Sequence, residues 1–215
     1  MDAGLLNASQ QPPATPLPIN WLGRADSPLS RADWAIISVL SETQQRNLLA
    51  QIAYGYSEWS YSKIGTNNEL GRYQFSTELL EQYNFLTTGS NSSYGTDCVN
   101  YQHCWRGAIN SYANYELDVV NLTDFLNKTS TQESLAQQRL LDLYNQCTKI
   151  NVIQGNDPAD VVAGMLYVAW QLGVGTPSNF SNNTGTGAYA WRYFNVGNGA
   201  PYYNAGRYSV VVLSK

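Results

Sequence analysis

The sequence predicts a mainly α-helical fold whose helices are joined by long loops. The segment 41–44, SETQ, is a capping box, and apolar residues follow it at helical spacing. Asp157-Pro158 places a proline in a first helical turn, and Gly173 supplies a helix end. The residues between them are apolar nearly all round, which is typical of a buried central helix. These signals together predict a helical frame.

The other expected elements follow from the same signals. A capping box at 30–33 leads into 34–37, and the helix that starts after Ser41 is expected to end near Gly55. No internal repeat is evident. In chain order the remaining expectations are a short helix at 77–85, a loop rich in Asn, Gly, Tyr and Cys at 87–110, helices at 122–128 and 131–148, and a strand-like apolar run from Ser209 to Leu213.

The composition excludes some classes of protein. The 215 residues can bury one good core, and 13% aromatic residues argue against a disordered chain. The net charge is −4 and basic residues do not cluster, so nucleic acid is not an expected partner. The 16 tyrosines and 6 tryptophans suit interfaces and sugar-binding grooves, or else a core that uses Tyr in place of Phe.

Residues 1–29 form a separate region. Five of the eight prolines lie here, at positions 12, 13, 16, 18 and 28. Proline fixes φ and removes a donor, so the segment is expected to be extended, with no core of its own. We expect this arm to lie on a neighbouring protein in an assembly; crystal contacts and packing on its own globule are the alternatives. The rest of the chain, 30–215, is expected to be one domain.

Cysteine and histidine usage points away from metal chemistry. Cys98, Cys104 and Cys147 are too few for a disulfide scaffold, so reduced thiols or one loop disulfide are expected. His103 and its neighbouring cysteines lack a fourth zinc ligand and the usual finger spacing. As the single histidine, His103 would also have to serve alone in a Ser-His-Asp or Cys-His arrangement. No metal and no cofactor are therefore expected.

Targeting and membrane signals are weak. The first residues have neither a basic region nor a long apolar stretch, so no signal peptide is expected. The longest apolar run, Val161 to Trp170, is too short to span a bilayer. We expect a protein that is synthesised in the cytoplasm and has no membrane span.

The candidate site begins at Glu58, near the end of a predicted helix. The segment 71–75, GRYQF, follows it and resembles the Gly-x-x-Gln motif of the lysozyme-like superfamily, in its lytic transglycosylase and resuscitation-factor branch. The segment 202–207, YYNAGR, is similar to the Ala-Tyr-Asn-Ala-Gly segment of that branch. The segments 124–127 and 131–133 are similar to lysozyme-like proteins in the tails and baseplates of tailed phages, cyanobacterial phages especially. The resemblance covers roughly 43–210 and implies a lysozyme-like domain.

The resemblance also implies a chemistry. A carboxylic acid held partly dry has a raised pKa and can protonate a glycosidic oxygen. Transglycosylases of this branch need no second carboxylate, because the N-acetyl and O6 groups of the substrate take the nucleophilic role. The site residues implied are the catalytic acid Glu58, Tyr73 and Gln74 lining a sugar groove, Gly71 allowing close backbone approach, and Tyr203 and Asn204 orienting the acid or the N-acetyl group. The alternative for Tyr73 and Tyr203 is that they are core aromatic residues.

The chain departs from the family pattern at the acid. In the family the catalytic Glu is followed by Ser and lies farther from the Gln, whereas Trp59 follows Glu58. A gapless alignment on Tyr61 and Gln74 puts Tyr56 at the catalytic position, and a two-residue shift on a helix rotates a side chain by about 200°. Glu69, beside the turn, is a second candidate for the acid. As a loop residue it is more simply a solvated charge.

The expected function follows from the resemblance. It is a structural component of a phage virion tail or baseplate, located in the virion and bound to other tail proteins through residues 1–29. Its lysozyme-like domain is expected to degrade host peptidoglycan during infection. The alternatives are a catalytically inactive lysozyme-like scaffold and a glycan-binding subunit.

Overall fold

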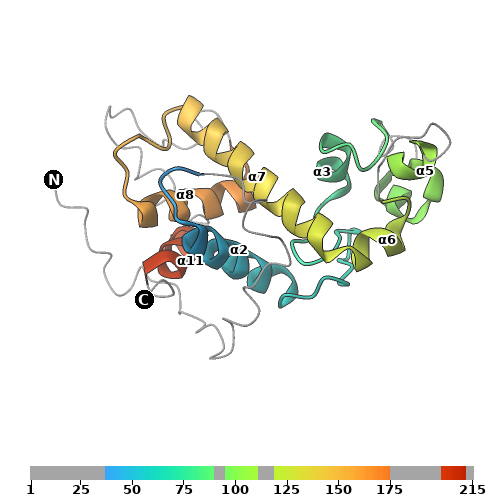
Figure 1. Ribbon diagram of the computed structural model, residues 1–215, viewed down its shortest axis with the longest axis horizontal. Coiled ribbons are helices and arrows are strands. Elements are labelled where there is room, and N and C mark those ends of the chain that lie inside the picture. The colour runs from blue at the N-terminus through green and yellow to red at the C-terminus, as the bar shows by residue number, and fades with distance from the viewer. Residues whose placement is uncertain (1–36, 90–94, 111–118, 175–199, 212–215) are drawn as a thin grey trace. The chain divides into compact units, whose positions relative to one another are not determined.

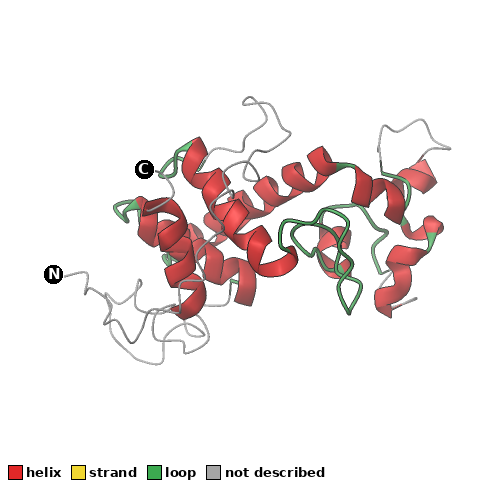
Figure 2. Ribbon diagram, turned by 90° about the horizontal axis from the view of Figure 1, so that it is seen from below, coloured by secondary structure: helices red, strands yellow, loops and turns green. Residues whose placement is uncertain are grey.

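A computed structural model describes residues 37–89, 95–110, 119–174 and 200–211 (Figure 1). This part of the chain is mainly helical, as predicted, and it contains isolated β-bridges but no strand (Figure 2). The α-helices are α2 (Glu42–Ser57), α3 (Thr77–Gln82), α5 (Arg106–Asn110), α6 (Leu122–Asn127), α7 (Thr129–Lys149), α8 (Ala159–Leu172) and α11 (Ala200–Val211). Two 3-10 helices, η3 (Gly95–Asn100) and η4 (Gln102–Cys104), precede α5. No helix in these ranges is both long and apolar enough to cross a membrane.

The described residues divide into two compact units. The first unit contains 37–51, 137–174 and 200–211, and the second contains 52–89, 95–110 and 119–136. Helices α2 and α7 each contribute residues to both units. The expected arm, 1–29, and the capping box at 30–33 lie outside the described residues.

Helix α8 is the buried centre of the first unit. All of its residues from Val161 to Ala169 are buried, which confirms the prediction from their apolar run. Pro158 is its N-cap residue, and Gly173 ends it with a φ of 80°. Helix α11 packs against α8 at two glycines. A Cβ atom on Gly206 would lie 2.5 Å from the carbonyl oxygen of Ala163, so only glycine allows this approach without a backbone shift.

The strand expected from Ser209 to Leu213 is wrong where the structure describes it. Residues Ser209 to Val211 belong to helix α11. A short apolar run cannot be assigned to strand or helix by periodicity alone. Burial decides the outcome here, because Ser209 and Val210 are both buried on the helix.

Aromatic side chains form the core of the second unit. Phe125 of α6 is fully buried, and its ring lies 5.7–6.1 Å from those of Phe75, Phe85 and Trp105. Two of these contacts have the edge-to-face geometry that aromatic quadrupoles favour. Trp105 also donates its indole N–H to the carbonyl of Val99 at 2.9 Å. This cluster joins the segments on either side of α3 to helix α6 and to the end of the 3-10 segment, in one core.

Several boundaries differ from the sequence predictions. Helix α2 runs past Gly55 to Ser57, and α3 ends at Gln82 rather than near residue 85. Helices α6 and α7 match the predicted ranges 122–128 and 131–148 to within two residues at each end. The loop predicted at 87–110 contains η3, η4 and α5, which are too short to give a periodic signal.

Candidate functional site

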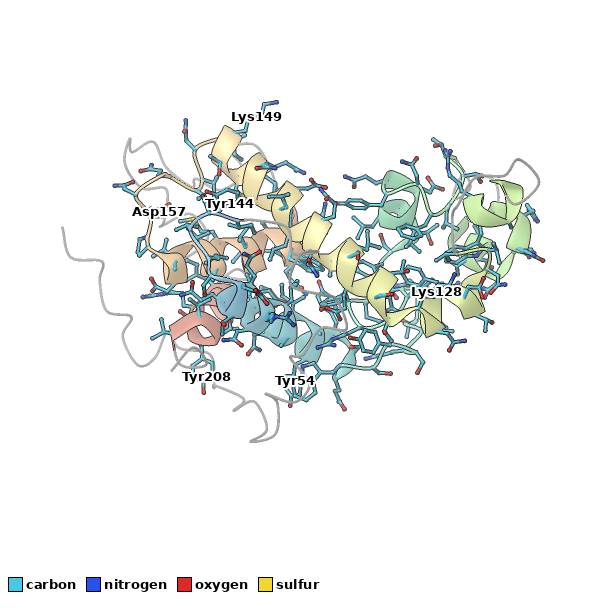
Figure 3. All side chains as sticks on the ribbon, viewed as in Figure 1. Tyr54, Lys128, Tyr144, Lys149, Asp157 and Tyr208 are labelled. Carbon is cyan, nitrogen blue, oxygen red and sulfur yellow. A yellow bond between two sulfur atoms is a disulfide. The ribbon has the colours of Figure 1, made fainter. Side chains whose placement is uncertain are left out.

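Glu58 lies on the turn that ends α2, and its side chain is exposed. Glu58 and Trp59 have φ values of 52° and 66°, in the left-handed region that non-glycine residues rarely adopt. The turn is held by its neighbours, since Trp59 is buried and its ring lies 4.7 Å from that of Tyr54, a side chain labelled in Figure 3. Strained backbone of this kind persists only where the surroundings enforce it. The acid is therefore displayed at a fixed point of the surface.

Ser57 links this turn to the GRYQF segment. Its hydroxyl donates to the carbonyl of Arg72 at 2.6 Å and contacts the carbonyl of Ala53 at 3.1 Å. The side chain is buried, so the hydrogen bond to Arg72 is shielded from water. Glu58 thus directly follows the residue that anchors the end of α2 to the 71–75 turn.

The two alternatives to Glu58 have other surroundings. Tyr56 is half-buried, and its carbonyl accepts a hydrogen bond from Lys63 Nζ at 2.6 Å. The carboxylate of Glu69 accepts hydrogen bonds from the backbone and side-chain nitrogens of Asn67, both at 3.0 Å. Burial alone would raise the pKa of Glu69, but hydrogen bonds from the Asn67 side chain and from the backbone outweigh it and lower this pKa. Glu69 is therefore held by hydrogen bonds within its own loop, and a lowered pKa is the opposite of the shift that favours a proton donor.

Gly71 and Gln74 shape the 71–75 turn. Gly71 has a φ of 74°, and a Cβ atom at this position would collide with Oε1 of Gln132. The close backbone approach expected at Gly71 is thus an approach to Gln132. Gln74 donates from Nε2 to the carbonyls of Gly71 at 2.8 Å and Lys63 at 3.2 Å. Its amide nitrogen holds the 63–71 loop closed.

A buried charged cluster lies beneath this turn. Arg72 Nη1 and Glu133 Oε1 are 3.2 Å apart, and the two side chains are only 4% and 3% exposed. The hydroxyl of Tyr61 donates to Glu133 Oε1 at 2.7 Å, and that of Tyr73 donates to Oε2 at 2.8 Å. The Arg72 guanidinium also lies over the rings of Tyr61 and Tyr73, at 4.9 and 5.7 Å. Both carboxylate oxygens are engaged.

The electrostatics of the cluster keep the tyrosines protonated. Burial raises the pKa of Tyr61 and of Tyr73, and the negative charge of Glu133 adds to the increase. Burial lowers the pKa of Arg72, but the nearby tyrosines and Glu133 outweigh this and raise it. The cluster therefore contains one cation, one anion and two neutral donors. Such a set favours a unique packing of the turn, and it engages both oxygens of Glu133.

Tyr73 has a role that differs from the sequence expectation of a residue lining a sugar groove. It is 2% exposed, and its ring lies 5.7 Å from that of Phe75 inside the second unit. Sequence reasoning did not select Glu133, the partner of its hydroxyl, as a site residue. A carboxylate on a helix is ordinarily read as a solvated charge, and its partners are distant in sequence, so no local pattern indicates the cluster.

Gln132 connects three segments of the second unit. Its Oε1 accepts the backbone N–H of Arg72 at 2.9 Å. Its Nε2 contacts the carbonyls of Tyr61 at 3.1 Å, Phe125 at 2.9 Å and Leu126 at 3.4 Å. The side chain is fully buried, so this amide replaces water for backbone groups that would otherwise be unsatisfied.

Tyr203 and Asn204, the other two expected site residues, lie on α11 in the first unit. Tyr203 is 2% exposed, and a Cβ atom on Gly164 would lie 2.7 Å from its ring. Burial raises the pKa of Tyr203 to about 12, with Arg207 partly opposing the increase. Asn204 is half-buried. The structure therefore brings Glu58, Gly71, Tyr73 and Gln74 into one unit and places Tyr203 and Asn204 in the other.

The three cysteines form one disulfide and leave one free thiol. Cys98 and Cys104 are bonded, with Cα atoms 6.0 Å apart, and Cys147 is a buried free thiol. The pair offers no thiolate to a metal ion. Within the described ranges no group of three His, Cys, Asp or Glu side chains could hold a metal ion.

Comparisons with family models, with curated proteins and with solved structures return no match.

Proposed function

We propose that this chain is a tail or baseplate subunit of a phage virion, with a lysozyme-like domain that cleaves the glycan strands of host peptidoglycan. The order of its short motifs along one chain supports the family. The observation that carries the activity is Glu58, an exposed carboxyl on a strained turn fixed by buried neighbours on both sides. An acid presented in this way is accessible to a long polymer such as a glycan strand, and the strained turn fixes its position.

The proposed reaction uses one protein carboxyl. The Glu58 carboxylic acid gives its proton to the bridging oxygen as the bond from that oxygen to C1 of the muramic sugar breaks. The O6 hydroxyl of the same sugar bonds to C1 and returns a proton to the carboxylate, which yields an anhydro sugar and regenerates the acid. The glycan lying across the turn would exclude water from Glu58, a condition that favours the protonated form of a carboxyl and so keeps a proton available for transfer.

The disulfide supports a working location outside a reducing cytoplasm. Disulfides persist in oxidising surroundings such as virion surfaces, and thiols are kept reduced in most cytosols. The bond between Cys98 and Cys104 is consistent with a particle that acts on the host wall from outside. On this proposal residues 1–29 bind neighbouring tail proteins.

A non-cleaving scaffold or glycan-binding subunit is the second candidate, and one observation favours it. Among the described residues of the second unit, the carboxylate that is sheltered from water is Glu133, and both of its oxygens accept from internal donors. Glu58 by contrast is exposed in the free protein, and the gapless alignment gives the position of the family acid to Tyr56. A subunit that kept the frame and lost the acid would have these features.

Digestion of purified peptidoglycan tests the proposal. The full chain should release soluble fragments ending in anhydro sugars, and Glu58→Gln should lower the rate by about 100-fold or more, the typical contribution of a general acid. Glu69→Gln is the matched control and should retain full activity. Cleavage by Glu58→Gln at the wild-type rate would move the acid elsewhere. Binding to sacculi without any cleavage by the wild-type chain would establish the second candidate.

The assembly role has a separate test. Particles produced with a chain lacking residues 1–29 should contain little or none of this protein, because the arm is the proposed contact. Normal incorporation of the shortened chain would contradict this part of the proposal, whatever the outcome of the digestion.

A further inference from the structure

The second unit contains a pocket of about 320 Å³ that the proposed function does not use. One wall consists of Val99, Asn100 and Gln102, from the 3-10 segment. The other wall is the stretch 121–124, where α6 begins (Figure 1). The volume lies at the lower end of the range typical of small-molecule sites. None of the residues that line it belongs to the Glu58 turn or the buried charged cluster.

The α6 wall is held in place by its own hydrogen bonds. Asn121 Oδ1 accepts the backbone N–H of Asp124 at 2.8 Å, as the N-cap of α6. Asp124 Oδ2 in turn accepts the backbone N–H of Val120 at 3.2 Å. These two side chains fix the orientation of the first turn.

The opposite wall is fixed by covalent and buried contacts. The disulfide between Cys98 and Cys104 closes the 3-10 segment, and Trp105 donates to the carbonyl of Val99. Cys98, Val99 and Trp105 are all buried, so this wall rests on the core. Both walls are therefore formed before any ligand arrives, which lowers the entropic cost of binding.

The remaining side chains of the pocket offer neutral hydrogen-bonding groups. Asn100, Gln102 and Thr123 are exposed, and their side chains make no hydrogen bond to another described residue. Together they offer two amides and a hydroxyl, groups that both donate and accept. Leu122, which is half-buried, adds apolar surface beside them. The wall contains no lysine or arginine, and Asp124 is acidic, so a phosphate or another anion is disfavoured.

We propose that this pocket binds a saccharide with acetamido groups, as a glycan-binding site separate from Glu58. Sugar hydroxyls need donors and acceptors together, and an acetamido group pairs with a side-chain amide through reciprocal N–H···O bonds. The C–H faces of the ring and the acetyl methyl group match the apolar surface of Leu122. The proposal rests on the proposed function in taking peptidoglycan as the source of the sugar. A second site would hold a strand on the domain between cleavage events.

Titration of the isotopically labelled full chain with a trimer of N-acetylglucosamine tests the site. Backbone amide signals of 99–102 and 121–124 should shift and saturate in the millimolar range. The double variant Asn100→Ala/Gln102→Ala removes two exposed side chains and should weaken binding by about tenfold. Gln82→Ala, a change of the same type at an exposed position of α3, is the matched control and should bind as wild type. Maltotriose, a trisaccharide of glucose that has no acetamido groups, should bind at least about tenfold more weakly.

The outcomes separate this inference from the proposed function. Absence of shifts at the pocket overturns the inference, as does unchanged binding by the double variant. Neither result bears on the proposal that the wild-type chain cleaves peptidoglycan. Pocket shifts in a chain that does not cleave the wall would support the inference and reject the proposed enzyme. If maltotriose bound as tightly as the trimer of N-acetylglucosamine, the assignment to acetamido sugars would be overturned.

Discussion

Arg72 and Glu133 form an ion pair inside the second unit, with Nη1 and Oε1 3.2 Å apart and both side chains nearly excluded from water. Burying two charges costs desolvation energy, which the pair recovers only when its remaining hydrogen-bonding groups are satisfied. Tyr61 and Tyr73 supply the donors that Glu133 needs. The pair fastens the GRYQF turn to helix α7, so the position of the candidate site depends on it.

Glu133→Gln should therefore be strongly destabilising. The substitution removes the negative charge and leaves the guanidinium of Arg72 buried without its counterion. We expect the free energy of unfolding to fall by about 3–5 kcal/mol, measured by urea denaturation. Glu78→Gln, on the exposed side of α3, should change it by less than about 1 kcal/mol. Equal effects of the two variants would show that the buried pair contributes nothing specific.

Gly71→Ala should destabilise the same turn by a different route. Alanine at a φ of 74° is strained, and its Cβ atom would collide with Gln132 Oε1. The two effects together should lower the free energy of unfolding by about 2–4 kcal/mol. Gly155→Ala is the matched control, because no atom lies within 4 Å of its Cβ position. A Gly71→Ala variant as stable as the control would mean that the turn relaxes freely.

Reduction of the disulfide should weaken the 3-10 segment. The bond closes a loop with a sequence separation of 6, for which loop entropy gives a stabilisation of about 2 kcal/mol. A strong reductant should lower the free energy of unfolding by this amount in the wild-type chain. The variant Cys98→Ala/Cys104→Ala should be insensitive to the reductant. An equal response in both chains would show that the loss of stability does not come from this disulfide.

High pH should destabilise the first unit through Tyr203. Burial raises its pKa from the ordinary 10.0 to about 12 in the folded chain. A raised folded pKa gives stability that is fully present below pH 10 and is lost as the pH rises through the folded value. Unfolding measured from neutral pH up to about pH 12 should show a loss of roughly 2 kcal/mol from this residue. Tyr203→Phe should reduce the slope over that interval, and an unchanged slope would contradict the assignment.

The sequence was sufficient where local signals decided the structure. Helix α8 has a proline at its start, a glycine at its end and an apolar run between them, and all three features act within the helix itself. Helix α11 has no comparable signal. Its last residues read as a strand, and only the close approach of Gly206 to α8 explains why they are helical and buried.

The candidate site could be predicted only in part, because local signals indicate some of it and contacts between distant segments form the rest. Glu58 was expected at a helix end and lies there, but its left-handed backbone depends on the burial of Trp59 and Ser57. The pairing of Arg72 with Glu133 joins segments that are far apart in sequence, and no spacing rule indicates it. The pocket beside α6 likewise arises from two separate segments that meet only in the folded unit.

Gln132 sets a limit on how this protein can be redesigned. Glutamate has the same shape but lacks the N–H groups that reach three carbonyls, and methionine has neither the donor nor the oxygen that receives the backbone of Arg72. The tip of the 62–70 loop is mostly exposed, so it should accept an inserted tag or epitope. The backbone at the two ends of that loop, at Tyr61 and Arg72, forms hydrogen bonds with the Gln132 side chain on α7. An insertion at either end of the loop would lose these contacts, which hold the two ends in place.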